Sequence, residues 1–282
     1  MSSPLPASPA AAPLIIRPSR GWISLKLREV WEYRELLYFL IWRDVKVRYK
    51  QTVLGAAWAI LQPFSLMVVF TVVFSRFARI PSDGIPYPVF SYTGLIFWSC
   101  FAKTVLGGTI AIVASANLIR KIYFPRESLL ISVVLSGLLD LGVSAVIFAG
   151  MLVYYHVPVG VTVLWVPLLL AQQTVFALAV IFLTAPMHVN FRDVGHGIPL
   201  VVQLWMFATP VAYPISLVPE SIRVLYSLNP MTPIIDGYRR TVLQGLPPEP
   251  GPLVFSAVVS VTLLVAGFAA FKRAERTFAD VI

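Results

Sequence analysis

Long apolar stretches, separated by short polar ones, dominate this chain. The apolar runs fall at about residues 53–74, 89–114, 129–154, 162–184, 198–213 and 253–271. A helix needs about 20 mostly apolar residues to cross the roughly 30 Å hydrocarbon core of a bilayer. The runs lack the apolar–polar alternation of barrel strands, and backbone groups in lipid must be paired within their own segment. We therefore predict an all-α, polytopic membrane protein with six transmembrane helices.

Composition agrees with the bilayer as the main solvent. The 282 residues are 58% hydrophobic and 12% charged, with a mean hydropathy of +0.80. Soluble domains contain about 25% charged residues. Because the six runs are joined by short loops, we expect residues 51–282 to form one six-span transmembrane domain, with no separate soluble domain.

Positive charge is distributed unevenly between the two sides of the predicted bundle. The net charge is +9, but the basic residues lie before and between apolar runs, which argues against a nucleic-acid partner. Of the 22 lysines and arginines, sixteen fall on the side that carries both termini and five on the other, with Lys103 inside a run. By the positive-inside rule, both termini are expected in the cytoplasm.

The segment before the first run has two parts. Residues 1–21 are rich in Pro, Ala and Ser and lack the basic stretch and apolar core of a cleavable signal peptide, so we expect a disordered leader. Residues 22–50 mix tryptophan and aliphatic residues with charges, which indicates an amphipathic helix in the plane of the cytoplasmic headgroups. A soluble docking helix is the alternative.

The fifth apolar run is too short for a simple span. Its 16 residues would give a helix of about 24 Å. The run contains Pro210 and is followed by Pro214 and by moderately apolar stretches that continue to Pro252. We predict short re-entrant helices over residues 214–252 that dip back into the outer leaflet. An outer loop of amphipathic helices would give the same proline-punctuated pattern.

Two ionisable residues lie deep inside predicted spans. Residue counting places Lys103 and Asp140 at similar depth, near the midplane, where an unpaired charge is costly. We predict an ion pair, or a shared wet cavity, between Lys103 and Asp140. The alternatives are a channel-lining role and separate snorkelling of Lys103 to the interface.

The histidines and the single cysteine do not predict a metal site. His188 and His196 are eight residues apart in one loop without a suitably spaced carboxylate, and His156 falls on the other side of the membrane. Cys100 lies inside an apolar run, so it predicts neither a disulfide nor a thiolate ligand.

Several stretches, taken in order, carry a family resemblance. They are residues 43–55 (RDVKVRYKQTVLG) with Trp58 and Gln62-Pro63, residues 190–193 (NFRD), Pro210 to Pro214, Asn229-Pro230, and residues 276–282 (RTFADVI). Over about residues 27–282 the chain resembles the type-2 ABC permeases, the membrane subunits of ABC exporters for O-antigen, capsule and teichoic-acid polymers. The resemblance implies two permease copies around a channel, two cytoplasmic ATPase subunits, and a lipid-linked glycan or polyol-phosphate polymer moved outward across the bacterial cytoplasmic (inner) membrane.

The chain lacks a phosphate loop of the type Gly-x-x-x-x-Gly-Lys-Ser/Thr. We therefore expect no catalytic residue and no cofactor in this chain, with ATP and Mg²⁺ used by the separate ATPase partner. One alternative is a permease for a drug or small lipid from the same superfamily. Another is a membrane-bound glycan transferase, which would need a polar catalytic cluster near the interface.

By the same resemblance, the loop over residues 115–128 holds a coupling helix that docks on the ATPase. The candidate coupling residues are Asn117, Arg120, Lys121, Tyr123, Phe124, Arg126 and Glu127. Aromatic anchors with basic flanks suit such a contact, because a few residues carry most of the energy of an interface. The alternative is that the basic residues only hold the loop in the cytoplasm while the aromatic residues lie in the headgroup region.

Aromatic residues make up 13% of the chain. Their rings can stack on the apolar C–H faces of sugars, but tryptophan and tyrosine also collect at both membrane interfaces without any such role. Relatives line their path with spans 1, 2 and 5, so the candidate channel-lining residues are Trp58, Phe64, Tyr92, Phe97, Trp98, Trp205 and Phe207. The candidate exit residues are Tyr213, Glu220, Asp236 and Arg239, with ordinary solvated polar faces as the alternative.

Overall fold

The computed structural model describes residues 31–50, 55 and 57–278, apart from the side chain of Val224. The predicted leader at 1–21, the start of the amphipathic helix at 22–30, and residues 51–54, 56 and 279–282 lie outside the described residues. Helices and turns, and no strands, make up the described part, which confirms the all-α prediction.

Five helices in the described part are long and apolar enough to cross a membrane. They are α3 (Ala57–Phe70) continued by the π-helical η1 (Thr71–Phe77), α4 (Tyr87–Ala114), α6 (Glu127–Tyr154), η2 (Val161–Trp165) continued by α7 (Val166–Asn190), and α11 (Pro250–Ala274) continued by η4 (Glu275–Thr277). They coincide with predicted spans one to four and six. The count of six is approximate, because the fifth run forms a shorter helix.

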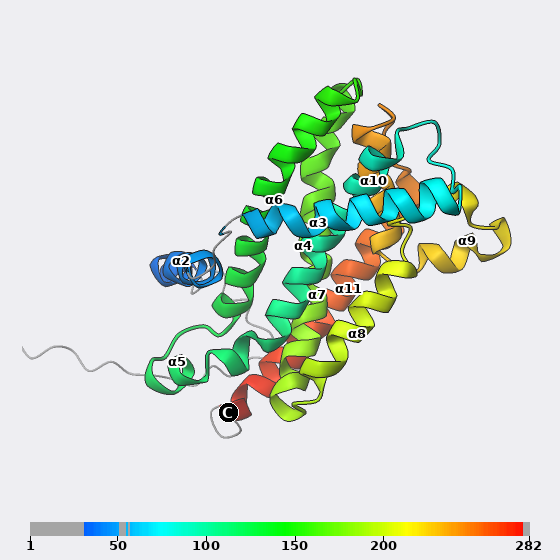
Figure 1. Cartoon of the computed structure of the whole chain (residues 1–282). Coiled ribbons are helices and arrows are strands. Elements are labelled where there is room, and N and C mark those ends of the chain that lie inside the picture. Colours follow the sequence, from blue (N-terminus) through cyan, green and yellow to red (C-terminus); the bar gives the residue numbers. More distant parts are fainter. Residues whose placement is uncertain (1–30, 51–54, 56, 279–282) are drawn as a thin grey trace, which may run out of the picture.

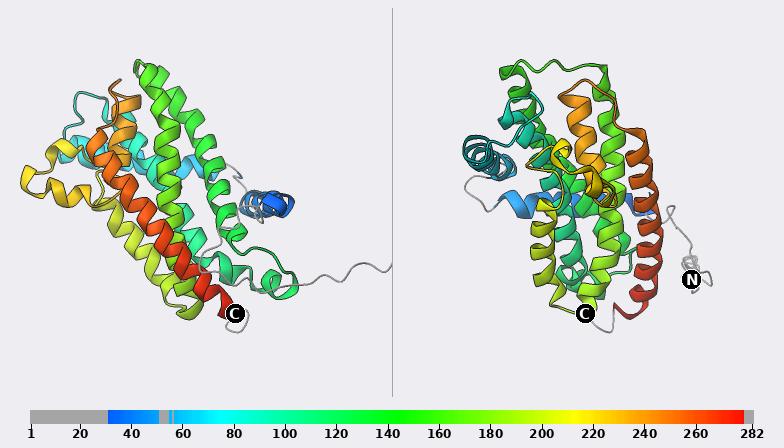
Figure 2. Two further views of the ribbon diagram at one scale, coloured as in Figure 1. Left: turned by 180° about the vertical axis from the view of Figure 1, so that it is seen from behind. Right: turned by 90° about the vertical axis from the view of Figure 1, so that its right-hand side faces the viewer.

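Helix α7 lies at the centre of the bundle, with α4 and α11 packed along it (Figures 1 and 2). Two glycines allow this close approach. A Cβ atom at Gly108 of α4 would lie 2.6 Å from Ile181 Cγ2, and one at Gly267 of α11 would lie 2.9 Å from the carbonyl oxygen of Ala179. Small residues at these contacts therefore set the separation of the helices, as is common in membrane bundles.

Helix α3 runs across the bundle instead of along it (Figures 1 and 2). It packs on α4 and α6 where it crosses them, and much of its remaining surface is exposed. Its continuation η1 begins at Thr71, whose hydroxyl donates to the Met67 carbonyl at 2.7 Å, next to the widened π-helical turns. Hydropathy predicted the length of this helix but not its inclination, because tilt is set by packing.

The fifth apolar run forms a broken unit. Helix α8 (Val194–Phe207) begins and ends earlier than the predicted 198–213, and a turn follows it. Pro210 and Pro214 lack the amide N–H that would continue the helix. The chain then forms η3 (Ile215–Leu217), α9 (Glu220–Ser227) and α10 (Met231–Val242). Helix α10 is mostly buried and packs against α4, α7 and α11.

The connections alternate between the two ends of the bundle. Helix α5 (Ala116–Lys121), the turn between α7 and α8, and the end of α11 lie at one end, which we call the α5 end (Figure 1). The loops that join α6 to η2 and α10 to α11 lie at the opposite end (Figure 1). Helix α2 (Arg34–Lys50) packs beside α6.

Candidate functional site

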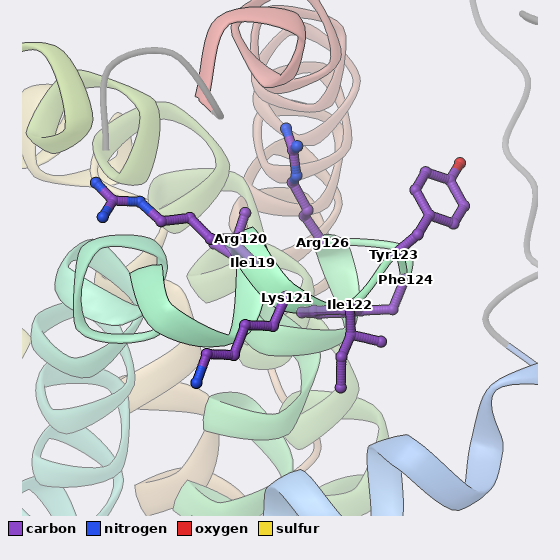
Figure 3. Close-up of a pocket in the computed structure, with 7 residues that line it drawn as sticks. All are labelled: Ile119, Arg120, Lys121, Ile122, Tyr123, Phe124 and Arg126. Atoms are coloured by element: carbon purple, nitrogen blue, oxygen red, sulfur yellow. The ribbon is translucent and has the colours of Figure 1, made fainter.

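The loop between α4 and α6 presents a small open hollow at the α5 end (Figure 3). Its volume is about 240 Å³, and it is lined by Ile119, Arg120, Lys121, Ile122, Tyr123, Phe124 and Arg126. Tyr123 is 77% exposed, whereas Phe124 is only 4% exposed and anchors the loop in the core. Asn117, Arg120 and Lys121 are also exposed. The loop therefore offers an aromatic ring and basic groups on a firmly held backbone, which suits a docking contact.

The base of this loop is tied to the end of α11. Figure 3 shows Arg126 pointing toward that end, while Tyr123 points away from it. The Arg126 guanidinium donates to the Glu275 carbonyl and lies 5.6 Å from the centre of the Phe278 ring. The buried Glu127 carboxylate forms an ion pair with Lys272. Spacing in the sequence gave no sign that Lys272 and Phe278 would meet the loop.

Asp140 is paired inside the fold, but its partner is not Lys103. Its carboxylate accepts hydrogen bonds from the Arg48 guanidinium and the Tyr49 hydroxyl at the end of α2. Among the described residues, no hydrogen bond or ion pair joins Lys103 to Asp140, although the two charges are close enough to interact. The structure thus pairs Asp140 with Arg48 and Tyr49 of α2, and the predicted cavity shared by Lys103 and Asp140 stays a prediction.

The residues around Asp140 form a polar ladder on one face of α6. Ser132, Ser136, Asp140 and Ser144 recur every four residues, so they lie on one face of the helix. Ser132 donates to Asp44 Oδ2 at 3.2 Å, and Ser144 donates to the Ala59 carbonyl at 3.0 Å. The ladder thus joins α6 to α2 and to the start of α3. The four-residue spacing was visible in the sequence and could have indicated this face.

Burial changes the acidity of Tyr49. Loss of hydration and, secondarily, the hydrogen bond to the Asp140 carboxylate raise the pKa of Tyr49 to about 12. The hydroxyl therefore stays protonated and remains a donor throughout the physiological range.

The candidate channel-lining aromatic residues separate into two groups. Tyr92, Phe97 and Trp98 are at most 5% exposed. Phe97 stacks on Tyr238 with ring centroids 3.4 Å apart, and Trp98 packs edge-on against Trp205 at 6.2 Å. These contacts make them core residues of the single chain, because α10 covers Phe97 and α8 covers Trp98.

The other candidates remain on the surface. Trp58, Phe64 and Phe207 are exposed, and Trp205 is half-buried. Trp58 and Phe64 lie on α3, and Phe207 ends α8. The surface of a single chain therefore offers these three rings to lipid or to a second protein.

Arg239 holds the turn that follows α8. It is 3% exposed, and its guanidinium donates to the carbonyls of Pro210, Val211 and Tyr213 while lying 3.7 Å from the centre of the Phe90 ring. A helix end leaves carbonyl groups without intrahelical donors, and Arg239 supplies donors to this turn. The Arg239 guanidinium is therefore not solvated in the single chain, because it faces backbone carbonyls and the Phe90 ring, and its place at an exit stays a prediction.

The remaining exit candidates lie near the same turn. The Tyr213 hydroxyl donates to the Phe207 carbonyl at 2.9 Å and lies 3.1 Å from the hydroxyl of Tyr226. Asp236 is half-buried on α10, and Glu220 is exposed at the start of α9. Of the four exit candidates, Glu220 is exposed, Tyr213 and Asp236 are half-buried, and Arg239 is buried.

No group of three or more potential metal-ligating side chains occurs in the described part of the chain. The Nδ1 atom of His188 accepts a hydrogen bond from the Gly195 amide at 3.1 Å, which closes the turn between α7 and α8. A Cβ atom at Gly195 would lie 2.5 Å from His188 Cε1, so any larger residue here would have to displace the imidazole ring.

These features define a class of protein. Long apolar helices, a broken fifth helix and an exposed loop anchored at the α5 end are those of a multi-pass membrane transport protein. The sequence model of the ABC-2 type transporter family matches residues 35–243. The chain belongs to the ABC-2 type transporter family, and its role is in transport.

Individual relatives agree with this assignment. The chain is similar to the O-antigen export system permease protein RfbA of Myxococcus xanthus, with 35% identity over 261 residues, which cover 91% of this chain and 98% of that protein. The Klebsiella pneumoniae RfbA permease is 28% identical over 92% of this chain and 100% of its own. The Escherichia coli polysialic acid transport protein KpsM is 21% identical over 84% of this chain and 92% of its own.

Proposed function

We propose that this chain is the permease subunit of an ATP-driven exporter that moves a lipid-linked, O-antigen-like polysaccharide outward across the bacterial cytoplasmic membrane. The observation that carries the proposal is the 35% identity to an O-antigen export permease along nearly the full length of both chains. Similarity to a polysialic acid transporter supports a glycan cargo over a drug or small lipid.

The division of labour follows from the family. A separate ATPase, present in two copies, would bind ATP and Mg²⁺, and the loop at residues 115–128 would dock on it. The exposed Tyr123 ring and the basic side chains at the α5 end support this docking. In this arrangement the α5 end and both termini face the cytoplasm, which agrees with the excess of basic residues on that side.

The channel would form between two copies of the chain. Each copy would contribute the exposed faces of α3 and α8, with Trp58, Phe64 and Phe207 as ring surfaces for sugars. Rings buried in the single chain, such as Tyr92 and Phe97, would support these faces from behind.

The broken unit from α8 to α10 would serve as the outer gate. Its buried α10 is consistent with re-entrant helices, since an ordinary outer loop would leave that helix exposed. The Arg239 guanidinium would hold the gate closed by binding the carbonyls of the turn after α8.

Deletion of the gene in its host, with complementation by the intact gene, tests the cargo. We expect loss of the long-chain surface glycan on deletion and accumulation of its lipid-linked form inside the cell. Complementation by a variant with Tyr123 changed to alanine should restore little export, while the same change at exposed Tyr154 should restore it fully. Normal surface glycan in the deletion strain would favour a drug or small-lipid cargo and would contradict the proposal.

A further inference from the structure

Several interactions join the loop at residues 115–128, which we call the coupling loop, to the end of α11. We call this contact the α11 clasp and define it by Arg126, Glu127, Lys272, Glu275 and Phe278. The Lys272 ammonium binds the Glu127 carboxylate and also Glu275 Oε2 at 2.9 Å. Arg126 binds the Glu275 carbonyl and covers the Phe278 ring. Both charged residues at the start of α6 therefore bind the same short segment at the end of α11.

The clasp is anchored in the core and does not rest on the surface. Phe278 is fully buried and packs edge-on against Phe271 with ring centroids 5.6 Å apart. Phe271 in turn packs against Phe182 of α7 at 5.2 Å. Because protein interiors are densely packed, a displacement of the loop cannot be absorbed locally at these rings.

The other end of α11 is tied to the broken unit. The Ser256 hydroxyl donates to the Pro230 carbonyl, just before α10, at 2.9 Å. Gln172 of α7 donates to Ser256 Oγ at 2.8 Å and to the Leu253 carbonyl at 3.1 Å. With 25 residues, α11 is about 37 Å long. It thus connects the coupling loop at one end of the bundle with the start of α10 at the other.

We propose that α11 is a second transmission element, and that Lys272 is a positioning residue that links it to the coupling loop. The loop already continues directly into α4 and α6, which carry its motion into the centre of the bundle. The clasp adds a path along α11 to α10, whose Arg239 holds the turn after α8. A displacement of Lys272 by Glu127 would therefore reach the turn after α8 through α11 and then α10. This inference rests on the proposed docking role of the loop.

A double-mutant cycle on the complete complex with its ATPase tests the inference. The variants are Glu127→Gln, Lys272→Met, both together, and the conservative Lys272→Arg. Arg276→Met is the matched control, because Arg276 is an exposed cation one turn further along. The readouts are ATP hydrolysis by the purified complex and glycan export per ATP hydrolysed.

The expected result is uncoupling. Export per ATP should fall about tenfold in Glu127→Gln, in Lys272→Met and in the double variant alike, while ATP hydrolysis stays within about twofold of the unaltered complex. Lys272→Arg should restore export, and Arg276→Met should leave both readouts unchanged. A purely structural role would instead lower complex yield and both readouts together.

The following outcomes separate this inference from the proposed function. Multiplying losses in the double variant, or normal export in Lys272→Met, would overturn the α11 path. If Tyr123→Ala retains ATPase binding and export as well, the docking role of the loop itself fails. If Tyr123→Ala abolishes ATPase binding while Lys272→Met remains normal, docking stands and only the α11 path is refuted.

Discussion

At the scale of single residues, the fold places its buried charges against specific partners. Asp140 lies in the middle of α6, where an unpaired carboxylate would be costly. Arg48 and Tyr49 from the end of α2 both bind it. The buried Arg239 guanidinium is also paired, because it donates hydrogen bonds to backbone carbonyls. These contacts join elements distant in sequence, so each fixes the position of one helix relative to another.

Removing Arg48 should loosen α2. The Arg48→Met variant leaves the Asp140 carboxylate with only its Tyr49 hydrogen bond, and because Arg48 is partly exposed we expect a loss of about 2 kcal/mol in stability. Thermal denaturation of the protein in detergent measures this loss. The control is Lys46→Met, because Lys46 is an exposed cation on the same helix. Equal stability of the two variants would contradict the structural role of the Arg48–Asp140 ion pair.

The stability losses on replacing buried Arg239 and its more exposed neighbour Arg240 can be compared directly. Arg239→Met removes the donors of three backbone carbonyls in a buried turn, and we expect a loss of about 3 kcal/mol. Arg240→Met removes the ion pair of Arg240 with the exposed Glu249, at 3.0 Å, and an exposed hydrogen bond to the Pro247 carbonyl. Because both contacts are exposed, it should cost under about 1 kcal/mol. Thermal denaturation and export assays should rank the two variants in this order, and the reverse order would refute the role of Arg239.

At the scale of elements, the sequence was informative about helix existence and length. Apolar runs one to four and run six form the five long helices. The shorter fifth run forms a helix that ends at Phe207, three residues before Pro210. The inclination of α3 and the burial of α10 could not be predicted, because they depend on neighbours and not on local periodicity. Asp140 illustrates the same limit, since its partner Arg48 is 92 residues away.

Helix separation provides a test at this scale. Gly108→Ala places a Cβ atom 2.6 Å from Ile181 Cγ2, so α4 and α7 must move apart, and we expect a loss of about 2 kcal/mol. Gly150→Ala on α6 meets no atom within 4 Å, so it should be neutral or stabilise by up to about 1 kcal/mol through helix propensity. Denaturation curves measure both effects. A neutral Gly108→Ala variant would contradict the close packing of α4 on α7.

At the scale of the whole molecule, long helices join the α5 end, where we propose that the ATPase docks, to the broken unit from α8 to α10. The sequence predicted the loop at 115–128, and the structure adds its attachment to α11 through Lys272 and Phe278. In the proposed arrangement, the exposed faces of α3 and α8 would line a conduit together with those of a second copy. A second copy and an ATPase are therefore part of the proposed working unit.

Reconstitution of the purified chain with its ATPase in proteoliposomes tests the proposed function most directly. The vesicles would contain the host's lipid-linked polysaccharide, and glycan reaching the opposite leaflet would be measured with a membrane-impermeant lectin. We predict movement that requires this chain, the ATPase, ATP and Mg²⁺ together, and that stops when the ATPase is inactivated. Movement without the ATPase, or no movement of the glycan while ATP is hydrolysed normally, would contradict the proposal.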